Sequence, residues 1–231
     1  MTPPLLAVVS RPTLEVLEEP GAPGEGLLSI PERERMARLQ RSADRDDFLA
    51  AHLLVRVCAA RVLGVAPGAV SIVQRCSTCG GPHGRPEVAG HPDVGVSLAH
   101  SRGVVAAAAG TVPVGVDVKA FPPADGLIPG DLSAALAPAE LAAIEAGADP
   151  RRAMLLAWAR KEACLKAGLV DLDALVDFDL SALPLDPAGG DLLARSLDHG
   201  DWVVHDWWDG RAGAIGAVVA PAAARLTLTG A

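Results

Sequence analysis

The sequence predicts an α+β fold in which two similar halves each place helices on a small, mainly antiparallel sheet. In both halves, segments with helical periodicity come before short apolar runs that are typical of strands. Two hairpin signals support this prediction. Ser-Arg-Gly lies between Val94–Leu98 and Val104–Gly110, and Asp-Gly-Arg separates Trp202–Trp208 from Ala212–Ala220. Because the sequence shows no exact repeat, the pseudo-twofold relation between the halves is inferred from the order of elements.

The N-terminal half begins with apolar residues that predict a strand. Pro31 can open the first helix, because its fixed φ and missing N–H suit the first helical turn. The expected elements are a strand at 5–9, helices from 31 to the low 40s and from 44 to 63, a strand at 71–75 and a long loop at 76–92.

The C-terminal half continues with the same kinds of element. After a strand at 114–118, which ends the run of elements of the first half, the expected elements are a Pro/Gly loop at 121–130, helices at 131–146 and 150–167, and a strand at 176–180 before the final hairpin. The length of 231 residues fits one large domain or two closely packed smaller ones, and we delimit the two halves as 1–115 and 116–231.

Charge and hydropathy exclude some classes of function. The net charge is −8, and residues 116–231 carry all of it, with 9 Lys or Arg against 17 Asp or Glu. A globally acidic protein is a poor nucleic-acid binder, so we expect no nucleic-acid partner and a local basic cluster for any bound anion. The sequence lacks an apolar run of about 18 residues and a positively charged leader. We therefore expect a cytoplasmic protein with no membrane span.

The cysteines are expected to be free thiols in such a protein; they are Cys58, Cys76, Cys79 and Cys164. Cys76 and Cys79 form a C-x-x-C motif, and His83 follows four residues later. A structural zinc site usually has four ligands, and the remaining candidates lack typical spacing; these are Cys58, His52 and His91. A metal-free loop is the favoured interpretation, and a zinc knuckle that binds partners is the alternative.

Three segments carry candidate chemistry. Asp117 lies inside an apolar strand, where a carboxylate is costly to bury unless it is paired or bound to a metal. On a helix, Trp158, Glu162 and Lys166 share one face. His100 ends the predicted strand Val-Ser-Leu-Ala-His-Ser. Each segment by itself also fits a plain structural role, as a turn residue or a surface Glu–Lys pair.

Taken together, these segments resemble the 4′-phosphopantetheinyl transferase superfamily. The superfamily pattern is a G-[IV]-D strand followed some forty residues later by W-x-x-K-E-A-x-x-K. Here these motifs are Gly115–Asp117 and Trp158–Lys166. Upstream, the superfamily has a strand ending in Ser-His-Ser and a Gly-Lys/Arg-Pro element, which resemble the segment around His100 and Gly84–Pro86. The resemblance covers residues from about 30 to 170. The length is similar to that of the surfactin-synthetase-type branch, which is monomeric and encloses its site between two similar halves.

The resemblance implies transfer of the 4′-phosphopantetheine arm of coenzyme A to a serine of an acyl or peptidyl carrier protein, with release of 3′,5′-ADP. Such carriers serve fatty-acid synthesis or secondary metabolism, and the sequence does not select among them. Mg²⁺ prefers carboxylates, phosphate oxygens and water as ligands. The resemblance makes Asp117 and Glu162 the metal ligands, in the C-terminal half.

The same resemblance supplies most of the other roles. The expected catalytic residues are Glu162, Lys166 and Glu140, where Glu140 follows a helix start similar to one that carries a base in the family. Glu162 or a metal-bound water are alternatives for this base. The expected coenzyme A contacts are Arg85 and His100 at the 3′-phospho-adenosine, Lys161 and Lys166 near the pyrophosphate, and Arg45. Arg45 is chosen because it shares an arginine stripe with Arg35, Arg38 and Arg41.

Two positions depart from the family pattern. Most relatives carry a third acidic ligand where this chain has Lys119, although some members lack it and use the other two carboxylates. Ala99 replaces a usual Ser. The alternative function is therefore a weak or inactive member that binds coenzyme A or a carrier protein. Because carrier domains are acidic, the docking surface should be apolar or locally basic, for example around Arg151, Arg152 and Arg160.

Overall fold

The computed structural model describes residues 5–76, 79–121, 132–186 and 190–228. The helices are α1 (Thr13–Leu17), α2 (Ile30–Ala37), α3 (Ser42–Leu63), α4 (Pro138–Ala146) and α5 (Pro150–Ala167). Short 3-10 turns occur at Gly24–Leu27, Pro67–Ala69, Leu132–Ala135 and Leu172–Ala174. The strands are β1 (Leu5–Pro12), β2 (Ile72–Gln74), β3 (Pro86–Val88), β4 (Gly95–Ser101), β5 (Val104–Gly110), β6 (Gly115–Ala120), β7 (Gly190–His199), β8 (Trp202–Asp209), β9 (Ala214–Pro221) and β10 (Arg225–Leu228).

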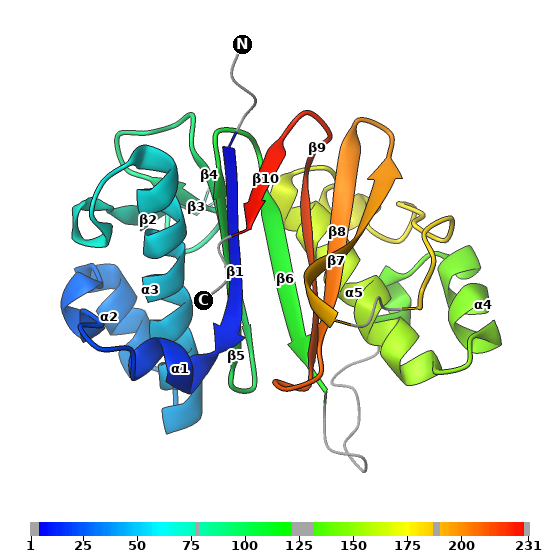
Figure 1. The fold of residues 1–231 in the computed structure, drawn as a ribbon, viewed down its shortest axis with the longest axis horizontal. Helices are drawn as coiled ribbons and strands as arrows, with labels where there is room; N and C mark the ends of the chain where they lie inside the picture. The colour runs from blue at the N-terminus through cyan, green and yellow to red at the C-terminus, as the bar shows by residue number, and fades with distance from the viewer. Residues whose placement is uncertain (1–4, 77–78, 122–131, 187–189, 229–231) are drawn as a thin grey trace.

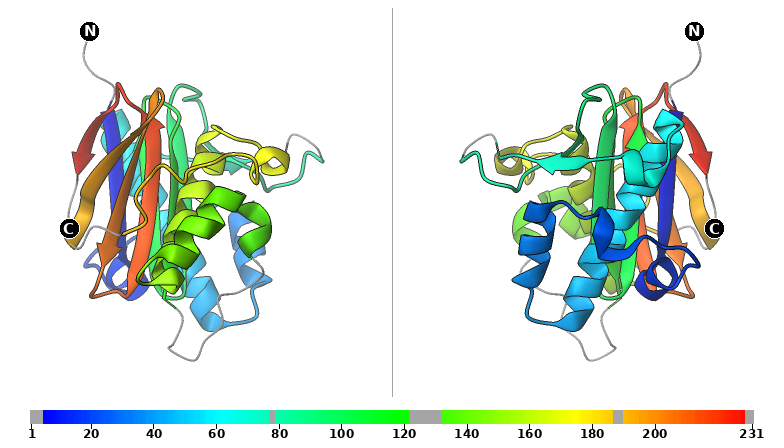
Figure 2. Two further views of the ribbon diagram at one scale, coloured as in Figure 1. Left: turned by 90° about the vertical axis from the view of Figure 1, so that its right-hand side faces the viewer. Right: turned by 90° about the vertical axis from the view of Figure 1, so that its left-hand side faces the viewer.

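The strands form two sheets that pack against each other. One sheet has the order β10-β1-β5-β4-β3-β2 and the other the order β6-β9-β8-β7. All neighbours are antiparallel except β1 and β10, which are parallel. In Figure 1, α1 to α3 lie on the left and α4 and α5 on the right, with strands such as β1, β6 and β8 between them. Figure 2 shows the molecule from each of these two sides, and in both views helices lie in front of strands. This is an α+β fold, as predicted.

The alternation of side chains along the strands produces these layers. In β1, Ala7 and Val9 pack with α3, whereas Leu6 and Val8 pack against the second sheet. On the far side of the second sheet, apolar residues of β9 pack against α5. All seven residues of β5 are buried, because both faces of this strand are covered. Among the described residues, none of the helices has the length and apolar character that crossing a bilayer requires.

Most of the predicted elements are present. Both predicted hairpins are confirmed, as β4–β5 and β8–β9. The first predicted helix ends at Ala37, earlier than expected, because α3 already begins at Ser42. The predicted loop at 76–92 contains the short strand β3, and β7 and β10 were not predicted. Apart from Phe121, the predicted loop at 121–130 lies outside the described residues.

The predicted strand at 176–180 is wrong. This segment follows a 3-10 turn and has no strand assignment. Side chains from two helices take up its backbone groups instead of a neighbouring strand. Lys161 Nζ donates to the carbonyls of Leu175 and Phe178, and Glu140 Oε1 accepts from the N–H of Leu180. With these groups satisfied by side chains, the segment needs no strand partner.

A buried polar cluster joins α2 to α3. Ser29 and Glu32 form a capping box at the start of α2. The Glu32 carboxylate also accepts from Arg56 at 2.6 Å and lies 2.7 Å from His52 Nδ1. Burial raises the pKa of Glu32, but hydrogen bonds from His52, Arg56 and the Ser29 N–H, together with the Arg56 charge, lower that pKa to about 2 overall. Glu32 is therefore an ionised anchor between the two helices.

This anchor predicts a pH-dependent stability. The pKa of Glu32 falls from 4.5 to about 2 on folding, so its contribution is fully present above pH 4.5 and is lost as the pH falls toward 2. Glu32→Gln is expected to lower the free energy of unfolding by on the order of 3 kcal/mol at pH 7 and much less at pH 2. Urea titrations at several pH values measure this difference, with the exposed Glu34→Gln as control. Equal losses at pH 7 and pH 2.5 would contradict this account.

Candidate active site

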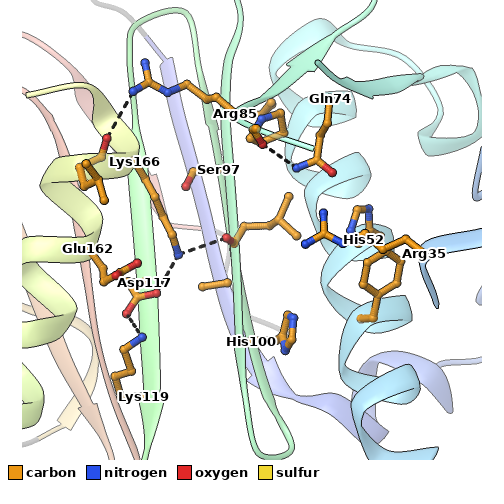
Figure 3. Close-up of a pocket in the computed structure, with 17 residues that line it drawn as sticks. Arg35, His52, Gln74, Arg85, Ser97, His100, Asp117, Lys119, Glu162 and Lys166 are labelled. Carbon is orange, nitrogen blue, oxygen red and sulfur yellow. Dashed lines mark hydrogen bonds and ion pairs between the residues drawn. The ribbon is translucent and has the colours of Figure 1, made fainter. Parts of the chain in front are cut away.

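A pocket of about 530 Å³ lies where the two sheets and their helices meet. Its lining comes from α2 and α3 on one side, β4 and β6 at the base, and α5 on the other side (Figure 3). The loop around Gly84–Pro86 adds a further wall. The volume is within the usual range for sites that bind small molecules and cofactors.

Asp117 of β6 is the most deeply buried acidic group in the described lining, with 2% of its surface exposed. Its Oδ1 accepts a hydrogen bond of 2.7 Å from Lys166 Nζ. Its Oδ2 lies 2.9 Å from Lys119 Nζ, yet it makes no hydrogen bond with correct angles to any described group. The Lys119 contact is therefore an ion pair without the geometry of a hydrogen bond. Asp117 Oδ2 thus has an ion-pair partner but no hydrogen bond to a described group.

Gly115 brings α5 close to β6. A Cβ at Gly115 would lie 1.9 Å from the Ala163 carbonyl oxygen and 2.5 Å from the Ala167 nitrogen, so any larger residue would push the helix away. The helix turns that meet the strand here also carry Glu162 and Lys166. The glycine of the G-V-D motif thus sets the distance between the acidic strand and the basic helix.

This contact predicts that Gly115→Ala weakens both the fold and the site. The added methyl group should reduce the free energy of unfolding by about 1–3 kcal/mol. It should also shift Lys166 away from Asp117. Gly26→Ala is the matched control, because a Cβ there has nothing within 4 Å and the φ is not left-handed. Thermal unfolding of both variants measures the effect, and equal melting temperatures for them would contradict the close approach.

Lys166 links the two sheets at the base of the pocket. Besides Asp117, its Nζ donates to the carbonyls of Val116 at 3.2 Å and Leu98 at 3.4 Å. Glu162 lies one helical turn earlier on α5, is half-buried and points from the helix toward Asp117 (Figure 3). The structure places Glu162 and Lys166 on one face of α5, as the helical spacing predicted, and this face meets Asp117 of β6 in the pocket.

Basic groups line other walls of the pocket. Arg85 donates to the Leu165 carbonyl at 3.3 Å, so its guanidinium sits at the C-terminal turn of α5, where a positive charge is favourable. Arg35 of α2 faces the pocket from the opposite side. Together with Lys166, they surround the pocket with positive charge suited to an anionic ligand.

His100 is exposed at the surface of β4, but neighbouring protein still removes part of its water. This desolvation lowers the pKa of His100; the charge of Asp47 opposes the shift, and His52, Lys166 and Arg35 add to it. Burial likewise lowers the pKa of His52, against a raising effect of Glu32. Both rings are therefore hydrogen-bonding groups more than charges at neutral pH.

Three of the predicted site residues lie elsewhere. Lys161 is completely buried and forms a 2.9 Å ion pair with the buried Glu140. Arg45 donates to the carbonyls of Leu39 and Gln40 after α2. None of these three side chains is in the described lining of the pocket. On a helix, a step of one residue turns the side chain by about 100°, so Lys161 points to the core while Glu162 faces the pocket.

Arg160 also differs from its expectation as part of a docking surface. It is fully buried and pairs with Asp206 of β8, which also accepts from Arg195. His52 and Gln74 also line the pocket, although neither was predicted to do so. The i, i+4 spacing of His52 and Arg56 indicates that both side chains can contact one common partner. Spacing alone did not identify this partner as Glu32, which lies on another helix.

The described residues fit a divalent cation. Asp117 offers a buried carboxylate oxygen without a hydrogen bond, and Glu162 offers a second carboxylate in the same pocket. Oxygen donors of this kind suit Mg²⁺ when a ligand supplies phosphate oxygens. Lys119 occupies the neighbourhood where a third carboxylate would help, and it reduces the negative charge there. In the described lining, Asp117 and Glu162 are therefore the two carboxylates that could bind the cation.

Comparison with known proteins gives one family match. A family model of the 4′-phosphopantetheinyl transferase superfamily matches residues 113–219, from just before β6 to β9. The search of curated proteins found no match. The matched region excludes Arg85 and His100, which come from earlier in the chain. This chain therefore carries, at residues 113–219, a match to the 4′-phosphopantetheinyl transferase superfamily, and the matched region includes Asp117, Glu162 and Lys166.

Proposed function

We propose that this protein transfers the 4′-phosphopantetheine arm of coenzyme A to a serine of an acyl or peptidyl carrier protein and releases 3′,5′-ADP. The observation that carries the proposal is the meeting of Asp117, Glu162 and Lys166 in one pocket, all three within the region that matches the superfamily. The buried carboxylate, the second carboxylate and the surrounding basic groups suit a ligand that carries a pyrophosphate.

Asp117 and Glu162 would hold Mg²⁺, which supplies charge neutralisation at the phosphoryl oxygens when bound. Lys119 is partly exposed, with its Nζ 5.8 Å from the centre of the Trp158 ring. A flexible lysine at the pocket edge can leave Asp117 Oδ2 and contact a phosphate instead. We propose that it does so when coenzyme A binds, so that it assists the two-carboxylate site.

Different basic residues would contact different parts of coenzyme A. Lys166 contacts the pyrophosphate, and Arg85 and His100 contact the 3′-phospho-adenosine moiety. Arg35 joins this set because it lines the same pocket. We no longer include Lys161 and Arg45 among the coenzyme A contacts, because their side chains are hydrogen-bonded to groups outside the pocket. Because the pKa of His100 is lowered, its ring should act through hydrogen bonds.

The reaction is a displacement at phosphorus. The carrier serine oxygen bonds to the β-phosphorus of coenzyme A, and the bond from that phosphorus to the oxygen of 3′,5′-ADP breaks. The serine proton passes to a base, for which we propose Glu162, because it lines the pocket whereas Glu140 is held by Lys161. Lys166 stabilises the negative charge that develops on the leaving group.

The layered fold supports further proposals about the whole chain. Each long helix, α3 or α5, packs on the outer face of one sheet while the two inner faces pack together. We propose that this reflects a pseudo-twofold pair of halves, 1–115 for the adenosine side and 116–231 for metal and catalysis. We further propose a monomeric, cytoplasmic enzyme of the surfactin-synthetase-type branch, with secondary metabolism as one of the pathways whose carriers are to be tested.

Release of 3′,5′-ADP tests this function directly. The protein is incubated with coenzyme A, Mg²⁺ and apo carriers of the fatty-acid, polyketide and nonribosomal-peptide classes, and the nucleotide is quantified by chromatography. We expect release that requires both Mg²⁺ and at least one of the carriers. Tight binding of coenzyme A without release on any carrier would reject the transferase and favour a binding module.

A further inference from the structure

A second cluster of chemically reactive side chains lies in the loop between β2 and β3. The donor atoms of Cys76, Cys79 and His83 all lie within 4.8 Å of one another. Cys79 Sγ and His83 Nε2 lie 3.0 Å apart. None of the three residues lines the main pocket. The fold therefore converges two thiols and an imidazole on one point that the proposed transfer chemistry does not use.

The backbone of this loop is folded so that the three side chains can converge. The Gly80 N–H donates to the Cys76 carbonyl at 2.9 Å, and the Cys76 N–H donates to the Gly81 carbonyl at 3.0 Å. A Cβ at Gly81 would lie 3.1 Å from His83 Cδ2 and 3.3 Å from Cys79 Sγ. A residue with a side chain at position 81 would thus crowd the sulfur and the ring that face each other.

We propose that Cys76, Cys79 and His83 bind one Zn²⁺ ion. Two thiolates and one imidazole are a donor set that favours zinc, whereas Mg²⁺ prefers oxygen ligands. With Zn–S near 2.3 Å and Zn–N near 2.0 Å, tetrahedral ligands lie roughly 3.3–3.8 Å apart, so only small side-chain movements are needed. Each thiol loses its proton to solvent on binding, and the two thiolates balance the charge of the ion.

The fourth position of this zinc is assigned to water. Cys79 and His83 are exposed, so solvent reaches the cluster, and the described residues offer three grouped ligands there. β2, which comes before this cluster in the chain, is the edge strand of its sheet. The ion lies in a surface loop that has little core to stabilise it.

The zinc would hold in place the loop that forms one wall of the pocket. His83 is followed directly by Gly84 and Arg85, and the Gly84 carbonyl accepts a 2.8 Å hydrogen bond from Gln74 at the end of β2. Fixing Cys76 to His83 therefore fixes the point from which Arg85 reaches the pocket. This consequence rests on the proposed function, whereas the binding of zinc does not.

The test measures metal on the full-length protein without a histidine tag. The protein is produced in zinc-supplemented medium, dialysed against metal-free buffer with a phosphine reductant, and analysed by inductively coupled plasma mass spectrometry. We expect about one zinc per chain, and a fall to background in Cys76→Ser, Cys79→Ser and His83→Gln. Cys58→Ala and His91→Gln are the matched controls and should keep the ion.

Cobalt substitution reports the ligands independently of zinc content. The Co²⁺ protein should show sulfur-to-metal charge-transfer absorption that weakens in each cysteine variant, while circular dichroism confirms that these variants remain folded. A wild-type protein that holds no zinc, or a zinc content unchanged in all three ligand variants, would overturn the proposal. A Cys76–Cys79 disulfide found by intact mass in reductant would also overturn it. A chain that binds zinc but transfers nothing rejects only the proposed function.

Discussion

Asp117→Ala is expected to abolish phosphopantetheinyl transfer, with a loss of at least about 10³-fold in kcat/KM. The substitution removes the buried carboxylate that would hold the metal and that also anchors Lys166 at 2.7 Å. Both the metal and the lysine would then lose their position relative to the pyrophosphate. Asp117→Asn keeps the shape of the side chain and should show a similar loss, which separates the effect of charge from that of a cavity. Product formation at saturating coenzyme A measures both variants.

Lys119→Glu is the comparison that sharpens this prediction. It replaces the ammonium group 2.9 Å from Asp117 Oδ2 with a third carboxylate. Transfer should remain intact or improve, and less Mg²⁺ should be needed for half-maximal rate, because a third oxygen donor and more negative charge favour the ion. A Lys119→Glu variant that folds but is inactive would contradict the two-carboxylate account.

Lys161→Met is expected to cost the protein about 3–5 kcal/mol of stability, which is the usual effect of leaving a buried charge unpaired. Lys161 has no exposed surface; it donates to the Leu175 carbonyl at 2.7 Å and pairs with Glu140 at 2.9 Å. Removing the ammonium group leaves the buried Glu140 carboxylate without this ion pair. It also removes the hydrogen bonds that Lys161 donates to the carbonyls of Leu175 and Phe178. Denaturant unfolding measures the loss, with the exposed Glu145→Gln of α4 as control.

A double-mutant cycle distinguishes this structural role from the coenzyme A contact that the sequence suggested. Glu140→Gln combined with Lys161→Met should cost clearly less than the sum of the single losses, because no unpaired charge remains. In the folded fraction of either single variant, the KM for coenzyme A should be unchanged. If Lys161→Met kept normal stability but showed a large rise in the KM for coenzyme A, Lys161 would be a coenzyme A contact, and the structure would be contradicted.

Local periodicity explains which site residues could be predicted. Glu162 and Lys166 are four residues apart, so any helix places them on one face, and the apolar strand around Asp117 identified a carboxylate that needs a partner. The phase of the helix relative to the pocket could not be read from spacing alone. That phase depends on Gly115, where the backbones of β6 and α5 meet.

Long-range partners explain what the sequence did not reveal. Glu140 was expected to act as a base because of its helix start, yet its carboxylate is committed to Lys161 and the Leu180 N–H, far along the chain. The segment 176–180 has strand-like composition, but these same side chains satisfy its backbone. β10 pairs with β1 across almost the whole sequence, and such pairing leaves no local pattern.

The most direct measurement of the central proposal is the intact mass of an apo carrier protein after incubation with this protein, coenzyme A and Mg²⁺. The proposal predicts that at least one carrier gains the mass of a single phosphopantetheine. The gain should disappear with Asp117→Ala, with chelator or with a carrier whose serine is replaced by alanine. A folded wild-type protein that adds no mass to any acyl, polyketide or peptidyl carrier would contradict it.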